Sequence, residues 1–147
     1  MTTKEKMNSN KKTTRTIIDV RIILSALWTA RVLSGLQGDS TRFHDPVALN
    51  ELIAGTTEIT VTNEMLLILS IILAVPILMS CLSLLLKNKA NRLANLITGI
   101  FFVVWELGFL FFVYLQAPVY EIFWGIAYLV FAALVVWYAW KWPTQES

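Results

Sequence analysis

The stretch Leu93–Leu115, LANLITGIFFVVWELGFLFFVYL, decides the fold of this chain. It is apolar almost throughout and contains one acid, Glu106, deep inside. A helix needs about 20 apolar residues to cross a hydrocarbon core of ~30 Å, so this stretch predicts a transmembrane helix. Similar apolar blocks occupy residues 65–86 and 119–140, and a weaker block occupies residues 17–36.

The composition indicates a membrane protein rather than a soluble domain. Of the 147 residues, 56% are hydrophobic and 15% are charged, whereas soluble domains have about 45–50% apolar and about 25% charged residues. We therefore predict an all-α membrane protein in which residues 17–142 form a bundle of four transmembrane helices. A disordered basic tail, residues 1–16, precedes the bundle, and a short tail, residues 143–147, follows it. The single cysteine, Cys81, excludes an intrachain disulfide.

The distribution of Lys and Arg predicts the orientation of the bundle. The N-terminal tail contains five basic residues, Lys4, Lys6, Lys11, Lys12 and Arg15. The connection between the second and third blocks contains three more, Lys87, Lys89 and Arg92. The long loop, residues 37–63, contains only Arg42. By the positive-inside rule, both termini lie in the cytoplasm and the long loop faces outward, which agrees with four crossings of the cell membrane.

The first block, residues 17–36, is the least apolar because Arg31 lies well inside it. A central arginine costs about 2.5–3.5 kcal/mol on insertion scales, so we expect packing against the later helices to hold this segment in the bilayer. An alternative is an amphipathic helix that lies on the membrane surface. A cleaved signal peptide is a further alternative, since a basic region precedes the apolar stretch, but no clear cleavage motif follows.

The connections between the blocks contain residues that typically begin helices, end helices or form turns. In the long loop, Asp45-Pro46 has the pattern of a helix start and Gly55 that of a helix stop, which predicts a short interfacial helix. The segment Lys87–Arg92 predicts a tight basic turn, which makes the second and third spans an antiparallel hairpin. Aromatic residues at both ends of the fourth span, among them Tyr120 and Trp124 at its start, predict interfacial belts.

Pro76 lies near the centre of the second span, where a proline removes a backbone hydrogen bond and usually kinks a helix. Ser80 and Ser83 follow on the same face, and their hydroxyls can bond backbone carbonyls or a neighbouring helix. A structural kink is the favoured interpretation, and a gating hinge is the alternative.

Arg31 and Glu106 form the candidate intramembrane polar site together with Asn95. Both charges lie ~20 Å from the cytoplasmic end of their spans, so equal depth and opposite sign predict a pair that faces the bundle interior. Asn95 shares the stripe of Glu106 on the third span, because their spacing of eleven residues returns to the same helix face. The favoured interpretation is a buried ion pair that fixes helix register. The alternative is a polar pocket that binds a small ligand or relays a proton.

No motif identifies a reaction. The sequence lacks a nucleotide-binding loop, a nucleophile elbow and a zinc helix, and no catalytic residue or cofactor is expected. His44 with Asp39 and Asp45 supplies ligand atoms in the long loop, but one histidine without a patterned partner favours a solvated loop over a metal site. The basic tail suits anionic headgroups of the lipid bilayer rather than nucleic acid.

Three classes of function remain open. The first is a non-enzymatic membrane protein that acts through a small ligand, as a homo-oligomer or with a membrane protein partner. The second is a small transporter or channel subunit with Glu106 in its pathway. The third is a membrane enzyme acting on a lipid or quinone, which the lack of a convergent His, Cys and Asp set makes the least favoured.

Three stretches carry a resemblance to a known family, the segment AVPILMSCLSLLLK (74–87), the turn KANRLAN (89–95) and the ending YAWKW (138–142). From about Ile23 to Trp142, the chain resembles a family of small prokaryotic four-span membrane proteins whose function is unknown. The resemblance implies the same four-span fold and supplies no activity or site residues. Where that family often shows an acid in the first span, this chain has Arg31, so the resemblance does not extend the Arg31–Glu106 pair to the whole family.

Overall fold

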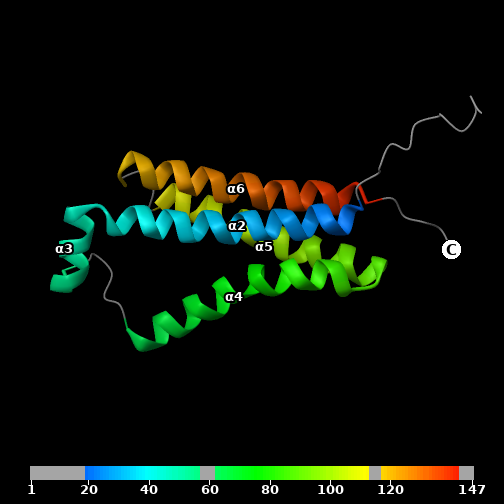
Figure 1. Cartoon of the computed structure of the whole chain (residues 1–147), viewed down its shortest axis with the longest axis horizontal. Helices are drawn as coiled ribbons and strands as arrows, with labels where there is room; N and C mark the ends of the chain where they lie inside the picture. The colour runs from blue at the N-terminus through cyan, green and yellow to red at the C-terminus, as the bar shows by residue number, and fades with distance from the viewer. Residues whose placement is uncertain (1–18, 57–61, 113–116, 143–147) are drawn as a thin grey trace, which may run out of the picture.

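The computed structural model describes residues 19–56, 62–112 and 117–142, and these residues form helices without any strand (Figure 1). The described helices are α2 (Val20–Phe43), α3 (Pro46–Ala54), α4 (Asn63–Leu85), α5 (Asn88–Phe112) and α6 (Val119–Trp140). The predicted all-α class is therefore confirmed. The predictions for the tails, residues 1–16 and 143–147, fall outside the described residues.

Three of these helices, α4, α5 and α6, are long and apolar enough to cross a membrane. They overlap the predicted blocks 65–86, 93–115 and 119–140, so each of these blocks contains a helix of membrane-spanning length and hydropathy. The helix α2 does not belong to this set. It combines an apolar first part with a second part that contains Arg31, Asp39 and Arg42.

The helix α2 is longer than the predicted block, because it continues from residue 36 to Phe43. Its start is stabilised by Asp19, whose side chain accepts a hydrogen bond from the backbone N–H of Arg21 at 3.0 Å. The second part contains no proline, and packing overrides the low helix propensity of Gly38. A Cβ atom at Gly38 would lie 2.2 Å from the Tyr128 hydroxyl and 3.3 Å from Trp124 Cγ, which shows how closely α6 packs there.

The short helix α3 has the caps that the sequence predicts. The Asp45 carboxylate accepts a hydrogen bond from the backbone N–H of Val47 at 2.9 Å, and Pro46 occupies the first helical position. Gly55 ends the helix with a φ of 66°, a left-handed conformation that favours glycine. Capping therefore explains why a nine-residue helix forms in the long loop.

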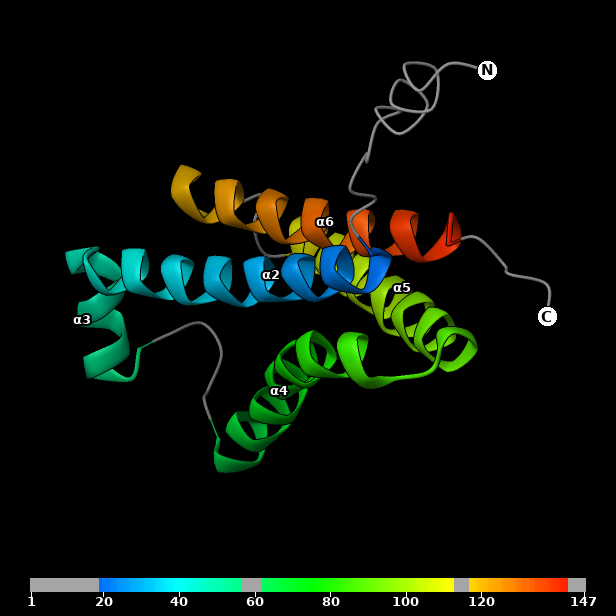
Figure 2. The same cartoon turned by 45° about the vertical axis from the view of Figure 1, so that its right-hand side comes forward.

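The helix α2 packs along both α4 and α6, and α5 packs along α6. The connection between α4 and α5 is shorter than the predicted turn, because α5 already begins at Asn88 and contains most of the segment Lys87–Arg92. The residues Lys89, Ala90 and Arg92 are good helix formers, so the helix starts directly after Lys87. The two helices run in opposite directions but diverge from their connection, as Figure 2 shows, so they are not packed as a hairpin along their length.

Pro76 divides α4 into two parts with different packing. The buried residues of α4 are Pro76, Met79 and Ser83, so none lies between Asn63 and Val75. In Figure 1, the part of α4 nearer its N-terminus inclines away from α2. The predicted kink site thus lies where full burial on α4 begins, and Ile72 and Val75 before it are only partly buried against the core.

Small residues allow α5 and α6 to approach each other. Ala132, Val135 and Ala139 of α6 are completely buried. A Cβ atom at Gly99 of α5 would lie 2.8 Å from Cγ2 of Val136. This close packing turns one face of α5 toward the interior of the bundle, and that face carries the polar residues described next.

Candidate functional site

A buried stripe runs along α5 and contains most of the polar atoms of the bundle interior. Its residues are Asn91, Asn95, Gly99, Phe102 and Glu106, all of which are buried. Their spacings of four, four, three and four residues keep them on one face of the helix. The sequence predicts Asn95 and Glu106 on this face, and it misses Asn91, which belongs to the predicted basic turn.

The structure joins Arg31 and Glu106 in an ion pair between α2 and α5. The two residues are 7% and 5% exposed, so both charges are removed from solvent and each requires the other. The guanidinium carbon of Arg31 also lies 4.1 Å from the centre of the Phe102 ring, which adds a cation–π contact. The pair therefore has no net charge and rests on an aromatic ring.

Asn95 belongs to a second polar group, which links three helices. Its carboxamide oxygen accepts hydrogen bonds from Trp28 Nε1 at 2.7 Å and from the Ser83 hydroxyl at 3.2 Å. Its amide nitrogen donates to the side-chain and backbone oxygens of Asn91, at 2.7 Å and 2.9 Å. Asn91 in turn donates to the backbone carbonyl of Ser83. Buried amides of this kind are stable only when they are hydrogen-bonded, and this requirement is met.

Phe102 separates the two polar groups. Its ring makes an edge contact with the Trp28 ring at 5.8 Å on one side and lies under the Arg31 guanidinium on the other. The candidate site predicted from Arg31, Glu106 and Asn95 is therefore two sites with an aromatic layer between them. In one site the two charges are paired with each other, and in the other the Asn95 amide is bonded within the same chain, an arrangement suited to fixing the register of α2 against α5.

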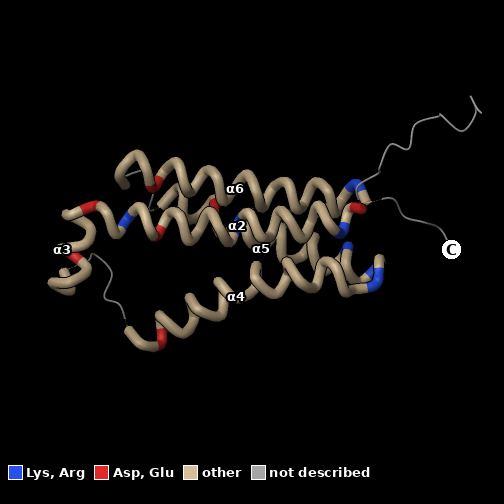
Figure 3. The backbone as a smooth tube through the Cα atoms, viewed as in Figure 1, with Lys and Arg blue, Asp and Glu red and all other residues tan. Residues whose placement is uncertain are grey.

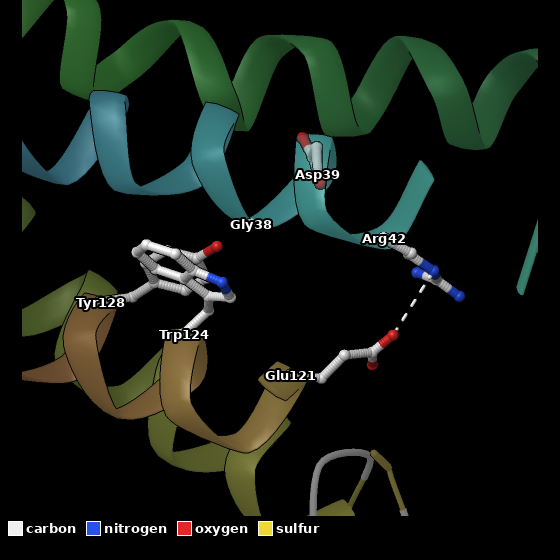
Figure 4. Close-up of a pocket in the computed structure, with 6 residues that line it drawn as sticks. All are labelled: Gly38, Asp39, Arg42, Glu121, Trp124 and Tyr128. Carbon is white, nitrogen blue, oxygen red and sulfur yellow. Dashed lines mark ion pairs between the residues drawn. The ribbon is translucent and has the colours of Figure 1, made fainter. Parts of the chain in front are cut away.

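A pocket that the sequence did not predict lies between the last part of α2 and the start of α6 (Figure 4). Its volume is about 70 Å³, and its lining residues are Gly38, Asp39, Arg42, Glu121, Trp124 and Tyr128. Arg42 Nε lies 3.5 Å from Glu121 Oε1. None of the residues predicted as the candidate site lines this pocket.

Contacts of α6 with α2 and with the residue before α3 hold the pocket in place. The Tyr128 hydroxyl donates to the backbone carbonyl of Ser34 at 3.3 Å, and the Tyr120 hydroxyl donates to Asp45 Oδ2 at 2.9 Å. The hydrogen bond from Tyr120, with those from the α3 backbone, lowers the pKa of the Asp45 carboxyl below its usual value. Asp45 therefore caps α3 and also ties it to α6.

The sequence does contain a signal for this pocket. Glu121, Trp124 and Tyr128 follow at spacings of three and four residues, which places them on one face of α6. The position of Trp124 near the start of the helix predicts an interfacial belt, but this prediction does not take the spacing into account. A carboxylate, Glu121, on the same helix face as two aromatic residues is the pattern that could have indicated a pocket on this face.

The residues considered for a metal site do not come together as one. His44 Nδ1 lies 2.7 Å from the backbone carbonyl of Ser40, and Asp45 is engaged with Val47 and Tyr120. Within the described residues, no group of three His, Cys, Asp or Glu side chains is placed to hold a metal ion.

Comparison with known proteins identifies one family. A family of unknown function (DUF6326) matches residues 17–147, which includes all of the described helices. A search of the curated proteins and a search of the solved structures each found no match.

Proposed function

We propose, for a chain that belongs to this family of unknown function, that it is a four-span membrane protein that works by binding a small ligand or a membrane protein partner. In this proposal the protein is not an enzyme, and it acts in the cell membrane as a homo-oligomer or together with its partner.

The position of α2 supports its role as the fourth span. It lies side by side with α6 in both views of the fold (Figures 1 and 2). Its 24 residues correspond to ~36 Å of helix, enough to cross the hydrocarbon core. Leu24, Trp28 and Arg31 are buried among the other helices, so the arginine need not face lipid.

The charge distribution supports cytoplasmic termini. Figure 3 shows basic residues gathered at the end of the bundle where α2 and α5 begin and α4 and α6 end. The acidic residues Asp39, Glu51, Glu64 and Glu121 belong to the opposite helix ends. Of the described Lys and Arg residues, only Arg31 in the interior and Arg42 lie away from the basic end, so the positive-inside rule supports an orientation in which that end faces the cytoplasm.

The observation that carries the proposed mode of action is the contrast between the interior and the pocket. In the interior, Arg31 and Glu106 neutralise each other, and Asn95 is bonded to residues of its own chain. The polar residues at the pocket surround an open cavity instead. A closed interior and an open pocket favour a binding protein over a transporter that uses Glu106.

The test is native mass spectrometry of the protein purified from its own membranes in a mild detergent. We expect an added mass in a fixed ratio to the chain, either a small molecule or a protein. In parallel, the protein is reconstituted in liposomes, and flux driven by a pH gradient is measured for the wild type and for Glu106→Gln. Flux that the substitution abolishes would replace this proposal with transport, and chemical conversion of a bound lipid or quinone would replace it with an enzyme.

A further inference from the structure

The aromatic residues form a wall of the pocket between α2 and α6. In Figure 4, the rings of Trp124 and Tyr128 lie together beside the turn of α2 that contains Gly38. The absence of a side chain at Gly38 makes this possible, because a Cβ atom there would collide with the Tyr128 hydroxyl. Ring faces of Trp and Tyr attract cations, most strongly where water is partly excluded.

The charged residues divide the pocket into an anionic interior and a cationic rim. Glu121 is the more enclosed group, since its side chain is 17% exposed, whereas the side chain of Arg42 is 58% exposed. Asp39, which is exposed, adds a second carboxylate at the edge of the lining. The Arg42 contact with Glu121 uses Nε, so the Nη groups at the exposed end of the guanidinium can reach an anion at the mouth.

The position of the pocket along the helices indicates which ligands can reach it. Gly38, Asp39 and Arg42 follow directly after the apolar part of α2, and Glu121 lies in the first turn of α6. If these helices cross the bilayer, the pocket lies at the level of the lipid headgroups. Its volume of about 70 Å³ holds a group of a few atoms.

We propose that this pocket binds a small ammonium group joined by a short carbon spacer to a phosphate, the chemistry of a phosphoethanolamine headgroup. The ammonium lies between Glu121, Asp39 and the faces of Trp124 and Tyr128, and the phosphate lies at the rim on Arg42. This inference rests on the proposed binding function and names the ligand class of that function. The headgroup can come from a phospholipid of the outer leaflet or from a free phosphoethanolamine ester.

The test measures binding to the full-length chain. Free O-phosphoethanolamine is titrated into the detergent-solubilised protein by calorimetry, with inorganic phosphate as the comparison. In a second arm, the protein is placed in phosphatidylglycerol nanodiscs with or without phosphatidylethanolamine, and the thermal midpoint is compared. We expect binding in at least one arm. Binding in the first arm identifies the free ester as sufficient, and a shift in the second arm alone identifies the lipid.

The matched variants are Glu121→Gln and Glu64→Gln. Both acids lie in the first turn of a helix at the same end of the bundle, but Glu121 alone lines the pocket. We expect Glu121→Gln to weaken binding roughly tenfold, a loss typical of one charged contact, and Glu64→Gln to leave it unchanged. Gly38→Ala should weaken binding as well, because it displaces the Tyr128 ring.

Two results would overturn the inference. One is the lack of binding by the wild type in both arms, which does not depend on the folding of any variant. The other is binding that Glu121→Gln and Glu64→Gln affect equally. In either case, a different ligand or partner found by native mass spectrometry would leave the proposed binding function intact, so the two failures are distinguishable.

Discussion

Asn95 is completely buried, yet its amide makes four hydrogen bonds, to Trp28, Ser83 and two oxygens of Asn91. Arg31 and Glu106 are buried as an ion pair, so each supplies the counter-charge that the other needs in the interior. A third bridge, from Arg21 to Asn88, joins α2 and α5 near their N-terminal ends. Long side chains therefore connect these two helices across the bundle at three depths.

The bond between Trp28 and Asn95 can be tested by a substitution that removes the donor and makes the buried ring smaller. Trp28→Phe keeps an aromatic ring but removes the Nε1 donor, so we expect the free energy of unfolding to fall by about 1 kcal/mol. The control is Trp140→Phe, because Trp140 is 69% exposed and its ring is not part of the core. Unfolding in mixed detergent micelles of increasing SDS content measures both. Equal losses for the two variants would contradict the role given to this bond.

The helices differ in how much of their surface is packed. On α5, Gly99 lies against Val135 and Val136 of α6, whereas a Cβ atom at Gly108 would have no neighbour within 4 Å. On α4, burial begins at Pro76 and continues toward the end of the helix. The packing of α5 on α6 and of the second part of α4 on α2 thus defines the stable part of the bundle.

The two glycines of α5 provide a matched pair for testing this packing. We expect Gly99→Ala to destabilise the protein by about 1–3 kcal/mol, because the valines beside it are stiff and cannot yield to a new methyl group. Gly108→Ala should be neutral or stabilising by up to about 1 kcal/mol, through the higher helix propensity of alanine. The same SDS titration compares them. A loss for Gly108→Ala as large as that for Gly99→Ala would refute the close approach of α5 and α6.

At the scale of the whole molecule, the apolar blocks and the opposite charges of Arg31 and Glu106 were sufficient to predict helices of membrane-spanning length and the ion pair. The length of α2 and the divergence of α4 from α5 were not predictable in this way. They depend on contacts between distant segments, such as Gly38 with Tyr128, that leave no local pattern. The pocket left a weak local signal, the spacing of Glu121, Trp124 and Tyr128, but this spacing is the same whether that face of the helix meets lipid or another helix.

The proposed orientation leads to a labelling prediction. After replacement of the single cysteine by Cys81→Ser, new cysteines are introduced one at a time as Glu51→Cys in α3 and Lys89→Cys in the first turn of α5. Both positions are exposed. A membrane-impermeant maleimide added to intact cells should label the first variant, and it should label the second only after the cells are permeabilised. The reverse pattern would place the termini outside.

The central claim of this account is that Arg31 and Glu106 stabilise the bundle as a pair and do not form a pathway. The most direct measurement is a double-mutant cycle of unfolding free energies with Arg31→Gln, Glu106→Gln and both together. Each single change leaves a buried charge without its partner and should cost about 3–5 kcal/mol, whereas the double change should cost little more than either one, or less. Additive effects, together with a neutral or stabilising Glu106→Gln, would contradict the claim. Glu106 would then be an acid retained at a cost to stability, as expected of a transport site.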